Sequence, residues 1–326
     1  MRYFGGGVAH VASVIEEDLR DRGTDLYRSH IAGLADLAAS VLACRSVNTS
    51  ELATVLPRVV KSDEERYRYI HRFLSNPRIV PHDVMGAYVW ELIAEAGSEG
   101  RTAILMLDQS KVGDGFECLM VSLRLAERAV PVAWKVVETG GAIGFDVQKP
   151  LLEAVTAMIP EGVSVLLAAD RFYGTAALIG WCQAQGWQYR IRLKSNLILE
   201  HEQAEIATGD AARMGMTSLD NAIMGSVRTH IGILHEKGHK EPWIIAMDCT
   251  PSRYKTLDYG MRWGIEAMFS DFKSRGFGVS KTKLRHADRI ERLILVLAIA
   301  TFWAVSTGMS PQPKPPPRSQ KKPAAA

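Results

Sequence analysis

Apolar and polar positions alternate in strand-length runs through the middle of the chain, from residue 102 to residue 193. Runs of this length that end at glycine-rich or charged turns are typical of β-strands, and two stretches with helical spacing lie between the later runs. The predicted strands are 102–108, 117–125, 130–138, 164–170 and 187–193, and the predicted helices are 146–159 and 175–185. This order predicts an α/β fold with a mixed sheet and flanking helices.

The segments around this α/β part have different patterns. Helical spacing dominates the N-terminal part, where Ser62 and Glu65 have the arrangement of a capping box. Short alternating runs after the fifth predicted strand indicate a β-rich insertion, after which helical spacing returns. The chain ends in a Pro- and Lys-rich stretch of the kind that remains disordered. The expected parts are a helical region (1–98), the first part of the core (99–194), the insertion (195–250), the helical end of the core (251–308) and the tail (309–326).

Two of the predicted strands end in an aspartate. Asp108 closes the first strand and Asp170 closes the fourth, each after a run apolar enough to be buried on both faces. A carboxylate at the end of such a strand leaves the core where ligands bind in open α/β sheets. Either aspartate alone is also typical of a turn or a helix cap.

A helical segment near the C-terminal end carries four polar residues on one side. At 100° per residue, Arg262, Glu266 and Lys273 lie within about 60° of Tyr259 on a helical wheel. One carboxylate beside two cations and a phenol suits a metal ion next to a phosphate backbone. A solvated helix face with an ordinary Arg262–Glu266 pair has the same spacing. The apolar residues on the opposite side, which predict docking on a core, are Ile265, Met268 and Phe272.

Charge supports a nucleic-acid partner only through its distribution. The net charge of +3 is low, and the tail alone contributes Lys314, Arg318, Lys321 and Lys322 without any acid. Between residues 251 and 292, however, ten Lys and Arg stand against five Asp and Glu. Such a local excess is the electrostatic footprint of nucleic-acid binding, although a solvated helix surface also produces it.

Several other classes of protein do not fit the pattern. The four cysteines are scattered without Cys-x2-Cys spacing, which favours neither a disulfide framework nor a zinc site. His235 and His239 belong to a His-Glu-x-x-His pattern, but strand-like alternation on both sides predicts a hairpin, in which this pattern does not bind zinc. The longest apolar run, Leu293–Val305, is shorter than a membrane span and predicts a buried closing helix. With no signal peptide evident, a cytoplasmic protein without membrane association is expected.

Two strand-end aspartates followed by a late helical glutamate resemble the plan of the IS4-type insertion-sequence transposases. The segment from Tyr259 to Lys273 matches the Tyr-x2-Arg-x3-Glu-x6-Lys signature of this family at all four positions. The surroundings of Asp108 and Asp170 are also similar, and the likeness extends from about residue 45 to about residue 305. The family has a ribonuclease-H-like fold with a β-rich insertion before its last catalytic helix. In that fold the first and fourth strands are neighbours, which implies that the two aspartates lie side by side.

The resemblance implies a DNA transposase of the Asp-Asp-Glu class. Asp108, Asp170 and Glu266 would be the catalytic residues and the ligands of two Mg²⁺ ions, with Mn²⁺ as a substitute. The implied partners are the terminal inverted repeats of an insertion sequence and a target DNA, bound by a homodimer in a synaptic complex near the nucleoid. The N-terminal helices resemble the DNA-end-binding region of the family. The expected DNA contacts are Tyr259, Arg262, Lys273, Lys194, Arg192, Arg285, Arg66 and Arg72.

Two other functions stay open at this point. A ribonuclease-H-fold nuclease or resolvase would have the same metal site without strand transfer. A catalytically silent relative that binds DNA and regulates transposition would retain the fold. Such a protein would not need the three acidic residues, which are all present here. An assay with end-labelled DNA distinguishes these functions, because only a transposase joins the released 3′ end to a target.

Overall fold

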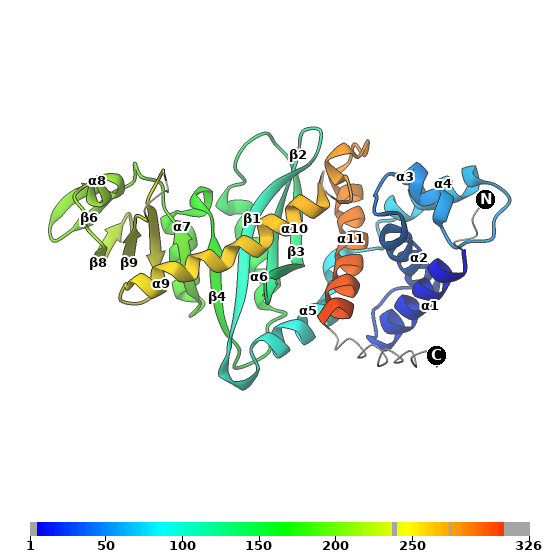
Figure 1. Cartoon of the computed structure of the whole chain (residues 1–326), viewed down its shortest axis with the longest axis horizontal. Coiled ribbons are helices and arrows are strands. Elements are labelled where there is room, and N and C mark those ends of the chain that lie inside the picture. The colour runs from blue at the N-terminus through cyan, green and yellow to red at the C-terminus, as the bar shows by residue number, and fades with distance from the viewer. Residues whose placement is uncertain (1–4, 237–239, 274–275, 310–326) are drawn as a thin grey trace, which may run out of the picture.

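The computed structural model describes residues 5–236, 240–273 and 276–309. Figure 1 shows an elongated molecule with the N-terminal helices at one end, a sheet through the middle and the insertion at the other end. The strands are β1 (Thr102–Gly113), β2 (Phe116–Leu125), β3 (Arg128–Glu138), β4 (Ser164–Ala169), β5 (Gln188–Arg192), β6 (Ile198–His201), β7 (Ala204–Ala207), β8 (Ser218–Met224), β9 (Val227–Leu234) and β10 (Trp243–Met247).

Helices cover this sheet and form the N-terminal end. The α-helices are α1 (Gly5–Asp21), α2 (Arg28–Cys44), α3 (Thr49–Val55), α4 (Asp63–Leu74), α5 (Pro81–Ala96), α6 (Phe145–Thr156), α7 (Ala176–Ala184), α8 (Thr208–Arg213), α9 (Arg253–Leu257), α10 (Trp263–Phe272) and α11 (Ala287–Met309). The 3₁₀ helices are η1 (Ser98–Gly100), η2 (Arg171–Tyr173), η3 (Asp258–Arg262) and η4 (Val279–Lys281).

The first five strands form the sheet of a ribonuclease-H-like fold. β1, β2 and β3 pair antiparallel, whereas β4 pairs parallel with both β1 and β5. β4 is buried from Val165 to Ala169, as expected for a parallel strand that is covered on both faces. Leu107 lies opposite Ala169, so the first and fourth strands are neighbours. The predicted fold class, a mixed sheet with flanking helices, is confirmed.

β1 is longer than the sequence pattern predicted. The apolar run ends at Asp108, but the strand continues to Gly113 because β2 supplies hydrogen-bonding partners along this part. Pairing with β4 stops at Leu107. The prediction that Asp108 closes its strand was therefore wrong: Asp108 lies inside β1, at the point where its parallel neighbour ends.

The β-rich insertion continues the same sheet. β10 pairs antiparallel with β5, with Ala246 opposite Ile191, and the full strand order is β3-β2-β1-β4-β5-β10-β9-β8-β6-β7. The predicted insertion before the last helices of the core is thus confirmed, and it adds an edge to the core sheet. β9 and β10 form the antiparallel pair expected around His235, but residues 237–239, including His239, lie outside the described residues.

The N-terminal helices share one hydrophobic core with the sheet. The Ser62 hydroxyl accepts the backbone N–H of Glu65 at 3.3 Å, as the predicted cap at the start of α4 requires. α11 packs against both β3 and α2, and its Ile294 and Leu297 are completely buried. The helical N-terminal region is therefore confirmed, and α11 is the element that joins it to the sheet.

α11 is also longer than the apolar run that predicted it. Its Ala287–Gly308 part is long and apolar enough to cross a membrane, but 61% of its most apolar window is buried inside the protein. Among the described residues, the bent pair of α2 and α3 would be the second candidate, with a 98° bend between its halves. The burial of α11 is that of a closing core helix. Beyond Met309, the expected tail lies outside the described residues.

Candidate active site

The parallel pairing of β1 and β4 places two carboxylates next to each other. Asp108 follows Leu107, and Asp170 follows Ala169, the residue opposite Leu107 in the register. Asp170 is the residue before η2, with extended backbone angles of φ −75° and ψ 170°. Asp170 was predicted to end the fourth strand, but β4 ends one residue earlier, at Ala169. Both acids lie at the same level of the sheet.

A single arginine connects these two acids with a third. The guanidinium of Arg262 donates to Oδ2 of Asp108 at 2.8 Å and also donates to Oε1 of Glu266. Its Nε donates to the Tyr259 hydroxyl at 3.1 Å, and this hydroxyl donates to Oδ1 of Asp170 at 3.3 Å. Carboxylates from β1, from the end of β4 and from α10 thus share one cationic side chain.

The helix that supplies these groups differs from the predicted one. The sequence predicted a regular helix from Tyr259 to Lys273, but η3 forms the first part and α10 begins only at Trp263. A 3₁₀ turn advances about 120° per residue instead of 100°, so the helical wheel does not hold there. Tyr259 and Arg262 are consequently buried, at 1% and 5% exposure, whereas the Glu266 side chain is 54% exposed. The apolar side is buried as predicted at Ile265, Met268 and Phe272.

The electrostatics of the site show an excess of negative charge. Burial raises the pKa of Asp108 to about 6, although the Arg262 guanidinium opposes the shift, and Asp170 and Glu266 raise it further. Burial likewise raises the pKa of Tyr259 to about 12, so the phenol remains a neutral donor. For Arg262, burial lowers the pKa, but Tyr259 and the three carboxylates outweigh burial and keep the guanidinium charged. One arginine therefore does not fully compensate the acids.

The donor set fits a hard divalent cation such as Mg²⁺. All three acids offer carboxylate oxygens, which are the ligands that hard divalent cations prefer. In this conformation, no group of three or more His, Cys, Asp or Glu among the described residues lies close enough together to hold a metal ion. Arg262 contacts both Asp108 and Glu266, so it provides the positive charge that a metal ion would bring.

A groove lined by cationic side chains includes Arg171, the residue that follows Asp170 in the chain. It is lined by Arg171 and Phe172 of η2, by Arg192 and Lys194 at the end of β5, and by Glu241. The Lys194 ammonium lies 5.7 Å from the centre of the Phe172 ring. Arg171 and Arg192 both pair with Glu241, at 3.0 and 3.3 Å. Two of the predicted DNA contacts therefore line one groove, together with an acid that the sequence analysis did not identify.

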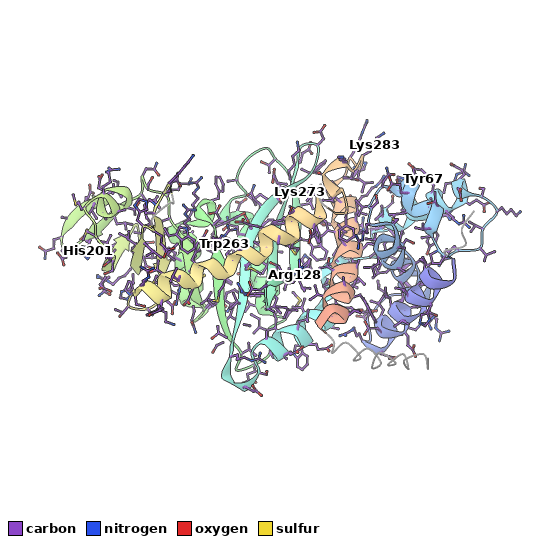
Figure 2. All side chains as sticks on the ribbon, in the orientation of Figure 1. Tyr67, Arg128, His201, Trp263, Lys273 and Lys283 are labelled. Carbon is purple, nitrogen blue, oxygen red and sulfur yellow. The ribbon has the colours of Figure 1, made fainter. Side chains whose placement is uncertain are left out.

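The other predicted DNA contacts lie apart from this groove. Lys273 is half-buried at the end of α10, and Figure 2 shows Trp263 and Lys273 along the same helix. Arg285 is exposed just before α11. Arg66 and Arg72 belong to α4 at the N-terminal end of the molecule, where Arg66 pairs with Asp63 at 2.6 Å. None of these four cations is among the residues that line the groove.

Arg190 is a buried polar residue to which the sequence pattern assigned no function. Its side chain on β5 is only 1% exposed, yet it pairs with Asp248 and Asp258. The sequence placed it in a predicted strand without assigning it a role. A charged residue between the apolar residues Tyr189 and Ile191 is the one signal in the sequence, and its partners are too distant in the chain to be recognised there.

The chain is similar to a known protein family. The model of a family described as the transposase DDE domain matches residues 131–303. The matched part includes Asp170 and Glu266 and begins after Asp108. No curated protein matches the chain.

Proposed function

The chain belongs to the transposase DDE domain family, and on this premise we propose that it cleaves the ends of an insertion sequence and transfers them to target DNA. The observation that carries the proposal is the convergence of Asp108, Glu266 and, through Tyr259, Asp170 on the single cation Arg262. Acids from three separate elements that share one positive charge are a poor arrangement for stability alone. They suit a site where positive charge is exchanged during a reaction.

In this proposal Asp108, Asp170 and Glu266 would hold two Mg²⁺ ions, for which Mn²⁺ would substitute. When bound, the ions would activate the attacking hydroxyl and stabilise the leaving oxygen of a phosphodiester. Arg262 partly compensates the charge of the acids in the metal-free chain and would exchange its contacts with Asp108 and Glu266 for a phosphate oxygen of the DNA. Tyr259, which remains neutral, would keep its hydrogen bond to Asp170 and so orient that carboxylate.

The DNA would extend from the acids over the exposed cations. Arg192 and Lys194 in the groove and Lys273 at the end of α10 would contact the backbone near the cleaved bond. We propose that the N-terminal region (1–98), with Arg66 and Arg72, binds the transposon end. Arg285 would contribute a further backbone contact.

Several finer features belong to the same proposal. The four-position signature from Tyr259 to Lys273 supports assignment to the IS4 type. The active form would be a homodimer that pairs two transposon ends, in the cytoplasm and close to the nucleoid. The remaining parts would be the core segments 99–194 and 251–308 and the insertion 195–250.

An end-labelled DNA assay tests the proposal. The chain is incubated with Mn²⁺ and a labelled duplex made from the DNA that flanks its gene, together with an unlabelled plasmid as target. A transposase releases the labelled end and joins it to the plasmid. A nuclease or resolvase releases the end without joining it, and a silent regulator retards the duplex in a gel without cutting it. Either of these two results overturns the proposed activity.

A further inference from the structure

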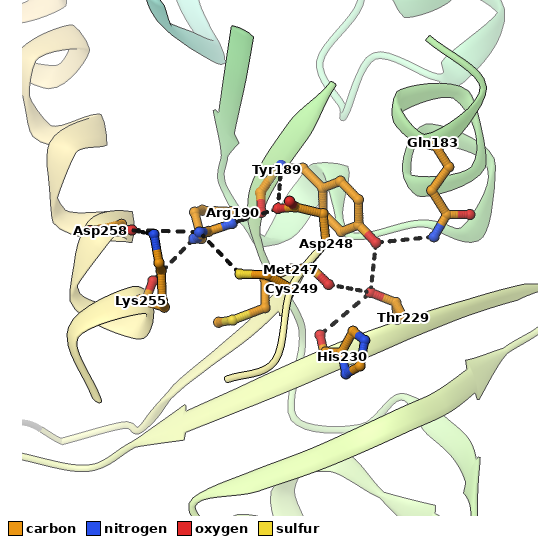
Figure 3. A network of polar contacts seen from close by, with 10 residues as sticks. All are labelled: Gln183, Tyr189, Arg190, Thr229, His230, Met247, Asp248, Cys249, Lys255 and Asp258. Atoms are coloured by element: carbon orange, nitrogen blue, oxygen red, sulfur yellow. Dashed lines mark hydrogen bonds and ion pairs between the residues drawn. The ribbon is translucent and has the colours of Figure 1, made fainter. Parts of the chain in front are cut away.

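Arg190 makes an unusual number of polar contacts for a side chain that is 1% exposed. Its guanidinium donates to Oδ1 of Asp248 at 2.7 Å and to Oδ2 of Asp258 at 3.5 Å. It also donates to the backbone oxygens of Lys255 at 3.1 Å and Tyr189 at 2.7 Å. Figure 3 shows these partners gathered around the guanidinium. A buried cation that donates hydrogen bonds to acceptors on several elements holds these elements together.

The partners come from three separate segments. Asp248 directly follows β10, Lys255 belongs to α9, and Asp258 is the first residue of η3. Asp248 also accepts the backbone N–H of Tyr189 at 3.1 Å, which holds it from a second side. The planar fork of an arginine serves several acceptors in fixed directions, whereas a lysine offers one nitrogen. Arg190 therefore fixes the start of η3 relative to β5 and β10.

The start of η3 determines where its side chains reach. Tyr259 follows Asp258 directly and donates to Asp170 at 3.3 Å, and Arg262 ends the same turn and donates to Asp108 at 2.8 Å. Among the described contacts of Arg190, none is with the three acids. Arg190 thus lies next to the machinery of the site without belonging to it.

We propose that Arg190 is a positioning residue for DNA cleavage, which holds η3 so that Tyr259 and Arg262 face the acids. The inference rests on the proposed function and concerns the same site. Displacing reacting groups by as little as 1 Å can cost about 10²-fold in rate. DNA affinity, in contrast, depends on exposed cations that Arg190 does not contact. A change at Arg190 is therefore expected to lower the cleavage rate far more than DNA binding.

Arg292 provides a matched control. It is another buried arginine, at 6% exposure, and it donates to the backbone oxygens of Ile79 and Leu74 and to Asp288 on its own helix. These contacts join α11 to the N-terminal helices, away from η3. Arg190→Lys and Arg292→Lys both replace a buried fork with a single nitrogen, so their effects on stability are comparable in kind.

The experiment measures three quantities for the full chain with Mn²⁺ and the labelled flanking duplex. These are the melting temperature, the dissociation constant for the duplex, and the single-turnover cleavage rate at saturating duplex. The cleavage rate of each variant is measured at the same number of degrees below the melting temperature of that variant. Arg190→Lys is expected to lower the rate by about 10²-fold and to leave the dissociation constant within about threefold. Arg292→Lys is expected to leave the rate within about threefold as well.

Asp258→Asn weakens the same contact by changing the acceptor. This variant tests the proposal even if the Arg190 variant does not fold. It is expected to lower the rate in the same direction, and in the double variant the two losses should not add, because both remove one link. A rate for Arg190→Lys that equals that of Arg292→Lys, or losses that multiply in the double variant, overturns the inference. A wild-type chain that binds the duplex but does not cut it overturns the proposed function instead, so the two failures are distinguishable.

Discussion

At Asp108, burial and the neighbouring guanidinium act on the same carboxyl group in opposite directions, and burial is the stronger. The folded-state pKa of about 6 lies above the unfolded value of 3.8, so this group contributes stability only at low pH. The contribution is complete below about pH 4 and is lost as the pH rises through about 6. At neutral pH the charged carboxylate of Asp108 therefore lowers the stability of the fold.

Asp108→Asn should therefore abolish cleavage, retain DNA binding and raise the stability of the metal-free protein. The gain in unfolding free energy should be about 1–3 kcal/mol at pH 8 and vanish near pH 4, since the asparagine is never charged. Thermal melts in a chelator across this pH range measure it. Asp288→Asn is the control of opposite sign: the Arg292 hydrogen bond lowers the pKa of Asp288, so that variant should lose stability at neutral pH. Full nicking activity in Asp108→Asn would show that Asp108 is not a catalytic residue.

The same pKa predicts how metal binding responds to acid. A carboxylate must lose its proton to ligate a metal ion, so Mn²⁺ affinity in the absence of DNA should be level above about pH 6. Below that value it should fall by about tenfold for each pH unit. Calorimetric titrations between pH 5 and pH 7.5 test this. An affinity that stays constant over the whole range would show that Asp108 is not a ligand.

Residue identities were predictable where the sequence carries a local signal. Asp108 and Asp170 follow buried apolar runs, and Glu266 belongs to a fixed-spacing signature. That the two aspartates are adjacent came from the family resemblance, because spacing along the chain does not determine strand order. The role of Arg190 was not predictable, since its partners Asp248 and Asp258 are 58 and 68 residues away and become neighbours only in the folded chain.

Among the elements, α9 and η3 depend on a close approach to the sheet. A Cβ on Gly232 of β9 would lie 2.2 Å from Oγ1 of Thr256, a buried side chain of α9. The sequence pattern predicted a β-rich insertion in this part of the chain but could not reveal this contact. In the same way, the helical wheel assumed a regular helix and missed the 3₁₀ turn that carries Tyr259 and Arg262 inward.

Gly232→Ala should push α9 from the sheet and carry η3 with it. The expected cost in stability is about 1–3 kcal/mol, as for other overpacked interiors, with loss of cleavage activity. Urea unfolding and the cleavage assay measure the two effects. Thr256→Ala removes the nearest clashing atom, so the double variant should recover much of the loss. Gly140→Ala is the control, because a Cβ there meets no atom within 4 Å.

At the scale of the whole molecule, the N-terminal helices and the sheet form one core. Buried residues of α1, α2, α5, α11 and the strands β1, β2 and β3 belong to one hydrophobic cluster. The change from helical to strand-like patterning had predicted a boundary near residue 98, and the domain division drawn there stays a prediction. The sequence pattern could not show that α11 packs both against α2, which precedes residue 98, and against β3, which follows it.

Removal of residues 1–98 should therefore leave an aggregating protein. The deletion uncovers the face of α11 that packs against α2, including residues of the long apolar run, and such a surface favours association. The full chain should melt in one transition by calorimetry, whereas independent domains would give two. Deletion of residues 310–326 is the control, and it should leave the melting temperature unchanged within about 2 °C.

The position of Arg262 has a consequence for the order of events after synthesis. Many small metalloproteins remain unfolded until their ion binds, because the free energy of metal binding is what folds them. In this chain the guanidinium of Arg262 pairs with both Asp108 and Glu266, so a positive charge is present without a metal ion. A newly made molecule could thus complete its interior without a metal ion, and the metal binding that we propose would be a separate, later step.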